Sequence, residues 1–85
     1  MTEAQEVETL LNYLSTHVVG KPDIQLTVDS SLIKSGLIDS FALVDVLTKL
    51  EDVTNLRIPA SKVQPKDMDT VNLMLATARR VGKPR

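Results

Sequence analysis

Three segments of this chain repeat aliphatic residues at the spacing of a helix, and no other feature limits the possible folds as strongly. In the first segment the apolar side chains recur every three or four residues, at Val7, Leu10, Leu11, Leu14 and Val18. The second segment runs from Phe41 to Leu50, and the third runs from Val71 to Val81. Such stripes are typical of amphipathic helices that share one core. The pattern therefore predicts an all-α domain.

The first helix is expected at about residues 3–18. Thr2 and Gln5 have the spacing of a capping box at its start, and Gly20 and Pro22 stop it.

A second helix is expected at about residues 40–54, with Asp39 as its N-cap. We assign its apolar residues to one stripe, which consists of Phe41, Val44, Leu47 and Leu50 and is widened by Leu43 and Val46. On this assignment Leu47 faces the shared interior, together with Leu75 of the last helix.

The last helix is expected at about residues 69–81, and the segment 67–70 offers residues that can cap it. Its stripe consists of Val71, Met74, Leu75, Ala78 and Val81. A short helical turn is expected from Pro59 to Val63. Gly82 ends the last helix, and a basic tail at about residues 82–85 is expected to fray.

The segment 20–38 joins the first two helices. Ile24, Leu26 and Val28 alternate as they would in a strand, but the sequence offers no convincing partner strand. We predict a long ordered loop that is pinned by its aliphatic residues. Loops of this length are uncommon and often serve a function.

Composition excludes several classes of function. Eighty-five residues favour one small domain over residues 1–85. Aromatic residues make up only 2%, so the bases of a single-stranded nucleic acid would have little to stack on. The net charge of −1 gives no strong field toward phosphates or membranes. Because cysteine is absent, disulfides, Cys-based zinc sites and a protein thiol nucleophile are excluded.

Neither a targeting signal nor a membrane span is evident. The first residues are acidic, and no apolar run approaches the ~20 residues that a membrane span needs. We expect a cytoplasmic protein. The chain has one histidine, His17, and no Gly-rich loop, so we expect no metal site. His17 is remote in sequence from Ser40 and no triad pattern exists, which argues against an enzyme.

The segment Gly36–Phe41 reads Gly-Leu-Ile-Asp-Ser-Phe, and Val44, Asp45 and Leu47 follow it. Here the chain resembles the acyl carrier protein family, and the similarity covers essentially all 85 residues. The Ile58-Pro59 pair before a short helix is also common in that family. The resemblance implies an acyl-carrier-protein-like four-helix bundle, with three main helices, one short helix and a long first loop.

The resemblance also implies a chemistry. Ser40 would carry a 4'-phosphopantetheine arm, which a separate phosphopantetheinyl transferase attaches from coenzyme A. Acyl or aminoacyl groups would travel as thioesters on the thiol of this arm. Asp39 would assist attachment by contacting the transferase or its metal ion. The other partners would be a loading ligase and a downstream synthase or transferase, and the carrier would be a monomer.

Phe41 departs from the leucine that usually follows the family's serine. Asp-Ser-Phe also occurs in D-alanyl carrier proteins, and fatty-acid carriers are usually strongly acidic, unlike this chain. We therefore expect a specialised pathway rather than housekeeping fatty-acid synthesis. The cargo stays open between acyl, polyketide-type and aminoacyl groups.

Four residues are candidate partner contacts: Phe41, Asp45, Glu51 and Asp52. Phe41 either packs in the core or covers the base of the arm. The three acids form either a docking surface for basic partners or simply a solvated helix face. The alternative function is a small helical protein-interaction or DNA-binding module without a prosthetic group, which would use a helical face and the basic tail.

Overall fold

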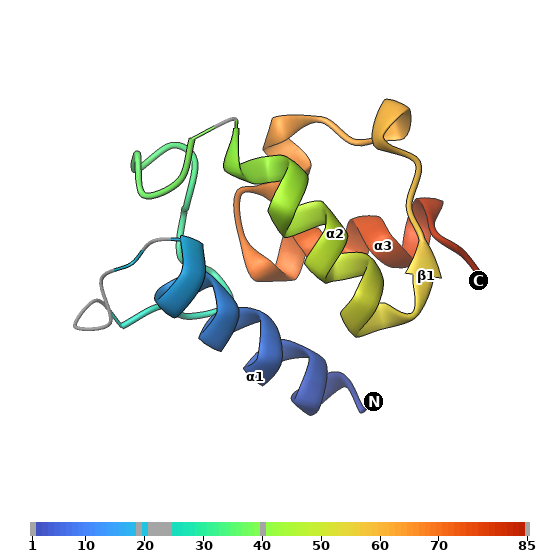
Figure 1. Cartoon of the computed structure of the whole chain (residues 1–85), viewed down its shortest axis with the longest axis horizontal. Helices are drawn as coiled ribbons and strands as arrows, with labels where there is room; N and C mark the ends of the chain where they lie inside the picture. The colour runs from blue at the N-terminus through green and yellow to red at the C-terminus, as the bar shows by residue number, and fades with distance from the viewer. Residues whose placement is uncertain (1, 19, 21–24, 40, 85) are drawn as a thin grey trace.

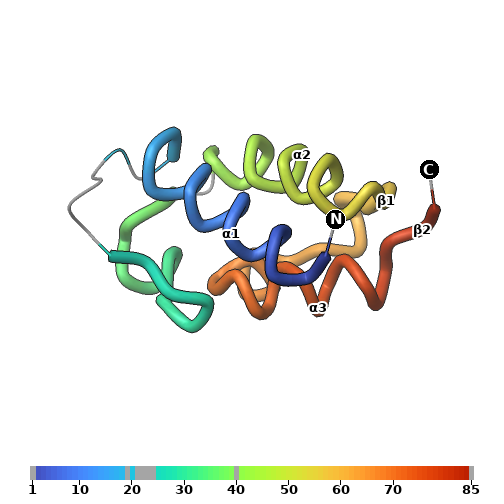
Figure 2. The backbone as a smooth tube through the Cα atoms, turned by 90° about the horizontal axis from the view of Figure 1, so that it is seen from below, coloured from blue at the N-terminus to red at the C-terminus, as the bar shows by residue number. Residues whose placement is uncertain are grey.

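A computed structural model of the chain describes residues 2–18, 20, 25–39 and 41–84. Its three α-helices are α1 (Glu3–Tyr13), α2 (Ala42–Thr54) and α3 (Val71–Val81). The three helices pack against one another around one aliphatic core (Figures 1 and 2). The structure confirms the predicted all-α bundle of the acyl carrier protein type.

The predicted capping box opens α1. The Gln5 N–H donates to Thr2 Oγ1 at 3.3 Å, and the Thr2 N–H donates to Gln5 Oε1 at 2.9 Å. This reciprocal pair satisfies two backbone donors that have no partner within the helix.

Beyond Tyr13 the helix continues as a π-helix, Leu14–Val18, so the helical segment ends where it was predicted to end. The hydroxyl groups of Ser15 and Thr16 both donate to the Asn12 carbonyl oxygen, at 3.2 and 2.7 Å. Hydroxyl groups that compete for a helix carbonyl disturb the regular ladder of hydrogen bonds, and the widening of the turn falls at this point.

α2 begins at Ala42, two residues later than predicted. The predicted cap contact is nevertheless present, since the Ala42 N–H donates to Asp39 Oδ1 at 3.0 Å. Phe41 already has helical dihedral angles (φ −71°, ψ −34°). The helix ends at Thr54, and Asn55 is its C-cap residue. The left-handed φ of 56° at Asn55 is typical of a helix C-terminus, and the Asn55 N–H donates to the Glu51 carbonyl oxygen.

The buried face of α2 differs from the predicted stripe. Val46, Leu50 and Val53 are buried, whereas the side chains of Phe41 and Val44 are 87% and 69% exposed. The prediction that Val44 belongs to the core stripe was therefore wrong, and of the two alternatives for Phe41, packing in the core is excluded.

The error has a geometric cause. The predicted stripe advanced strictly by three residues, and each such step falls about 60° short of a full helical turn. Over the nine residues from Phe41 to Leu50 the stripe rotates by about half a turn, so these two residues lie on opposite faces. Leu47 is only partly buried for the same reason, whereas Leu75 is buried as predicted.

Two 3₁₀-helices lie between α2 and α3: Ala60–Lys62, which is the short turn predicted after Pro59, and Pro65–Met68, which was not predicted. α3 then begins at Val71 rather than at residue 69, with the Leu73 N–H donating to Thr70 Oγ1 at 3.0 Å. Its predicted stripe is confirmed, since four members are buried and the fifth is partly buried: Val71, Met74, Leu75, Ala78 and Val81.

The end of the described chain pairs rather than frays. β2 (Lys83–Pro84) runs antiparallel to β1 (Leu56–Arg57). Gly82 permits the approach, because a Cβ atom there would collide with the Ala78 carbonyl oxygen and lie 3.1 Å from Leu56 Cβ. Strands of two residues have no periodicity, so the sequence pattern could not reveal them.

Residues 25–39 form the predicted ordered loop and contain no strand. Leu32 and Ile38 are buried in the core. The other aliphatic residues of this part of the loop are partly buried against the core: Leu26, Val28, Ile33 and Leu37. Ile24, the first member of the alternating triplet, lies outside the described residues.

Candidate functional site

The predicted attachment residue, Ser40, lies outside the described residues, but both of its neighbours are described. Asp39 and Phe41 are exposed, and α2 begins directly after them. The described residues on either side of Ser40 are therefore exposed, and they directly precede the N-terminal end of a 13-residue helix. Unpaired N–H groups and the helix dipole favour negative charge at such an end.

Three of the predicted partner contacts share one exposed face of α2. Phe41, Asp45 and Asp52 are separated by four and seven residues, a spacing that returns to the same side of a helix, and all three are exposed. Val44 is also exposed and lies beside this face. We call Phe41, Val44, Asp45 and Asp52 the α2 face.

Glu51, the fourth predicted partner contact, bonds to the backbone of a neighbouring segment. Its Oε2 atom accepts a hydrogen bond from the Ile58 N–H at 2.9 Å, and this part-buried contact ties α2 to the segment that follows β1. Sequence reasoning missed this role because the partner is a backbone group seven residues away. The contact gives Glu51 a structural task in addition to the predicted docking one.

An apolar groove adjoins the α2 face. One wall is formed by residues of α2, and the other by the two 3₁₀-helices and the residues between them: Leu43, Val44, Leu47, Ala60, Val63, Gln64, Pro65 and Met68. The pattern of α2 did not predict the groove, because its second wall comes from a segment that has no helical periodicity.

A buried carboxylate holds the loop that leads to Ser40. Asp69, directly before Thr70 and the start of α3, accepts hydrogen bonds from the Ile33 and Lys34 N–H groups at 2.9 and 3.1 Å and from Ser31 Oγ. Burial acts to raise the pKa of Asp69, but these hydrogen bonds and the Lys34 charge outweigh burial and hold the pKa below its usual value. The sequence offered Asp69 only as a helix cap.

Comparison with known proteins decides the family. No protein-family model matches the chain. A D-alanyl carrier protein of Leuconostoc citreum is 32% identical over 76 residues, which cover 89% of this chain and 91% of that protein. The chain belongs to the acyl carrier protein family. It is a carrier protein, and it also resembles D-alanyl carrier proteins of other species.

Two other relatives support the assignment. A D-alanyl carrier protein of Latilactobacillus sakei is 27% identical over 74 residues, covering 87% of this carrier protein and 95% of the relative. One of Streptococcus suis is 28% identical over 69 residues, covering 81% and 85%. The matches span most of both chains, so the likeness concerns the whole carrier domain rather than the Asp-Ser motif.

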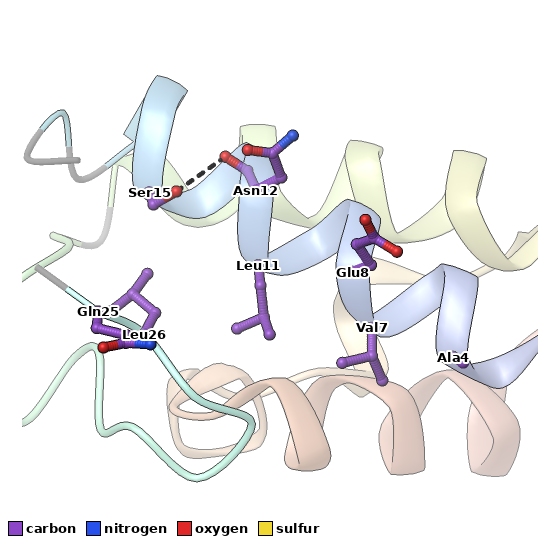
Figure 3. Close-up of a pocket in the computed structure, with 8 residues that line it drawn as sticks. All are labelled: Ala4, Val7, Glu8, Leu11, Asn12, Ser15, Gln25 and Leu26. Carbon is purple, nitrogen blue, oxygen red and sulfur yellow. Dashed lines mark hydrogen bonds between the residues drawn. The ribbon is translucent and has the colours of Figure 1, made fainter. Parts of the chain in front are cut away.

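The carrier protein has a second, wider groove between α1 and residues 25–26 of the loop (Figure 3). Apolar side chains of Val7, Leu11 and Leu26 line it, with Ala4 and the polar residues Glu8, Asn12, Ser15 and Gln25. None of the predicted site residues lines this groove.

Two basic residues near the end of α3, Arg79 and Arg80, have acidic neighbours. Arg79 Nη2 lies 3.6 Å from carboxylate oxygens of both Glu3 and Glu6, and Arg80 Nη2 lies 3.8 Å from Asp67 Oδ1. These exposed pairs reduce the local positive charge that a DNA-binding surface would need.

The described residues contain neither a group of side chains suited to a metal ion nor a helix that could cross a membrane. Among residues 2–18, 20, 25–39 and 41–84, no three His, Asp or Glu side chains are grouped so as to hold a metal ion. Within the same residues, no helix has the length and apolar character needed to cross a membrane.

Proposed function

We propose that this carrier protein bears a 4'-phosphopantetheine arm on Ser40 and presents acyl or aminoacyl groups, held as thioesters, to partner enzymes. The observation that carries the proposal is the entry into α2, where Asp39 caps the Ala42 N–H and Ser40 follows Asp39 in the sequence. The bound group would supply the thiol that this cysteine-free chain lacks.

The residues around Ser40 suit a phosphodiester. The N-terminal end of α2 favours an anion nearby, and the exposed side chains of Asp39 and Phe41 leave room for an approaching transferase. His17, the one histidine, lies in the last turn of the π-helix, with its ring 5.4 Å from the Tyr13 ring. We assign it no role at Ser40, so the transferase would activate the serine hydroxyl, with Asp39 assisting.

The α2 face is the docking surface in this proposal. Phe41 and Val44 expose apolar area that a partner enzyme can bury, while Asp45 and Asp52 supply negative charge beside it. Glu51 would contribute mainly by holding the Ile58 segment in place. The partners would be the phosphopantetheinyl transferase, a loading ligase and a downstream synthase or transferase.

An aminoacyl cargo has the strongest support. The relatives described above are named D-alanyl carrier proteins, and Phe41 replaces the leucine usual in the family. We accordingly place the carrier in a specialised pathway. We also propose that it is a cytoplasmic monomer, formed by one domain over residues 1–85. D-Alanine is the first cargo to test.

The test is intact-mass analysis of the purified apo protein after incubation with coenzyme A and a promiscuous phosphopantetheinyl transferase. We expect the wild-type protein to gain the mass of one phosphopantetheine group, Ser40→Ala to gain none and Ser35→Ala, in the same loop, to react like wild type. No gain in the wild-type protein, or a gain that survives Ser40→Ala, would contradict the proposal.

A further inference from the structure

The four hydrogen bonds to the Asp69 carboxylate all come from one short stretch of loop. Ser31 Oγ lies 3.1 Å from Oδ1 and 2.9 Å from Oδ2, and the Ile33 and Lys34 N–H groups donate to Oδ1 at 2.9 and 3.1 Å. Asp69 is 7% exposed, so these donors replace water around its charge. A buried carboxylate with this many partners fixes the position of residues 31–34 relative to the start of α3.

The same anchor continues toward Ser40. The Leu32 N–H donates to the Asp69 carbonyl oxygen at 2.8 Å, and the Ile38 N–H donates to the Leu32 carbonyl oxygen at 3.1 Å. Ile38 is buried, and it directly precedes Asp39. Asp39 in turn caps the Ala42 N–H. A series of contacts thus leads from the Asp69 backbone through Leu32 and Ile38 to Asp39, the residue before Ser40.

A second contact holds the loop but does not lead to Ser40. Asn72 bonds to the earlier part of the loop. Its N–H donates to the Val28 carbonyl oxygen at 3.0 Å, and its Nδ2 donates to Asp29 Oδ1 at 2.7 Å. The loop therefore has two anchors near the start of α3. The Asp69 anchor is the one that joins the segment ending at Asp39.

We propose that Asp69 is a positioning residue for arm attachment: it sets where Ile38 and Asp39 lie relative to α2, and so how the transferase meets the serine that follows them. This inference rests on the proposed modification of Ser40. The side chain holds the residues on either side of Leu32, namely Ser31, Ile33 and Lys34, whereas the backbone bond from Leu32 to the Asp69 carbonyl oxygen survives its replacement.

The kinetic test compares Asp69→Ala, Asp69→Asn and a matched control, Val53→Ala, in attachment of the arm by the transferase. Val53 is buried near the far end of α2, so its truncation lowers stability without touching the loop. We expect Asp69→Ala to lower kcat/KM for the carrier roughly tenfold, since small misplacements of a reacting group have effects of this size or larger. The KM for coenzyme A should stay unchanged.

Asp69→Asn should recover most of the rate, because an amide oxygen can still accept from the Ile33 and Lys34 N–H groups. The kcat/KM of Val53→Ala should remain within about twofold of the wild-type value, because this change leaves the segment that ends at Asp39 in place. Equal slowing of Asp69→Ala and Val53→Ala at matched folded fraction, or a wild-type rate for Asp69→Ala, would overturn the inference.

A second measurement needs no transferase. Amide hydrogen exchange should be roughly tenfold faster at Ile38 in Asp69→Ala than in Val53→Ala, under conditions where local opening dominates. Unchanged exchange at Ile38 would overturn the positioning role even if Ser40 is modified. Failure of the wild-type protein to accept the arm would instead refute the proposed function, and the Ile38 result would still decide what Asp69 holds.

Discussion

The Ala42 N–H and the Asp39 carboxylate lie 3.0 Å apart, and Ser40 falls between these two residues in the sequence. In the sequence, the residue proposed to carry the arm therefore belongs to the four-residue segment whose ends this hydrogen bond joins at the start of α2. Asp39 has two possible tasks there, as a cap and as a contact for the transferase.

Substitution of Asp39 separates these tasks. Asp39→Ala removes the cap and should lower the free energy of unfolding by about 0.5–2 kcal/mol, whereas Asp39→Asn keeps an acceptor and should change it by only a few tenths of a kcal/mol. If Asp39 also contacts the transferase or its metal ion, both variants should slow arm attachment. Urea unfolding and initial rates measure the two effects, and a wild-type rate for Asp39→Asn would restrict Asp39 to capping.

Replacement of Phe41 tests the α2 face. Because its side chain is 87% exposed, Phe41→Ala should change the free energy of unfolding by no more than about 0.5 kcal/mol. Loss of an apolar anchor should instead raise the KM of the transferase or loading ligase for the carrier severalfold, with little dependence on salt. Leu73→Ala, at an exposed apolar position on α3, serves as the control. An unchanged KM would remove Phe41 from the docking surface.

The helices could be predicted because their signals are local. The capping box at Thr2 and Gln5 and the stripe of α3 involve residues a few positions apart, and both are confirmed. The contacts that organise the site are not local. Asp69 reaches Ile33 across 36 positions, and β1 pairs with β2 through only two residues on each side. No periodic pattern records such partners.

The exposed end of α2 was misassigned for a related reason. Apolar residues occur on both sides of this helix, so periodicity allowed two stripes, and tertiary packing chose the one through Val46, Leu50 and Val53. Of the two apolar residues left exposed, Phe41 follows Ser40 in the sequence and Val44 lines a groove. Apolar residues that the core leaves exposed here are what a docking surface requires.

Stability measurements can check the corrected face of α2. Leu50→Ala removes a buried side chain and should lower the free energy of unfolding by about 2–5 kcal/mol. Val44→Ala removes exposed methyl groups and should stay within about 0.5 kcal/mol of wild type. Denaturation in urea gives both values. Similar losses for the two variants would show that α2 is rotated from the position described above.

The Asp69 anchor predicts a pH dependence. Its folded-state pKa is depressed below the ordinary value of 3.8, so the stabilisation is fully present above the unfolded pKa and is lost as pH falls through the folded value. The free energy of unfolding of the wild-type protein should therefore decrease below about pH 4 more steeply than that of Asp69→Asn. Since the other carboxylates are common to both proteins, the difference isolates Asp69. If the difference in free energy of unfolding between the two proteins stayed constant from neutral to strongly acidic pH, the Asp69 carboxylate would not stabilise the fold through its charge.

Arm attachment at Ser40 is tested most directly by locating the modified residue. Trypsin cleaves after Lys34 and Lys49, so it releases Ser35–Lys49, a peptide that contains Ser35, Ser40 and Thr48 as hydroxyl-bearing residues. Tandem mass spectrometry of this peptide, from protein purified out of its native host, should place a single phosphopantetheine group on Ser40 and reveal any cargo still attached. A peptide that carries no group in the native host, or a group on Ser35 or Thr48, would contradict the proposed function.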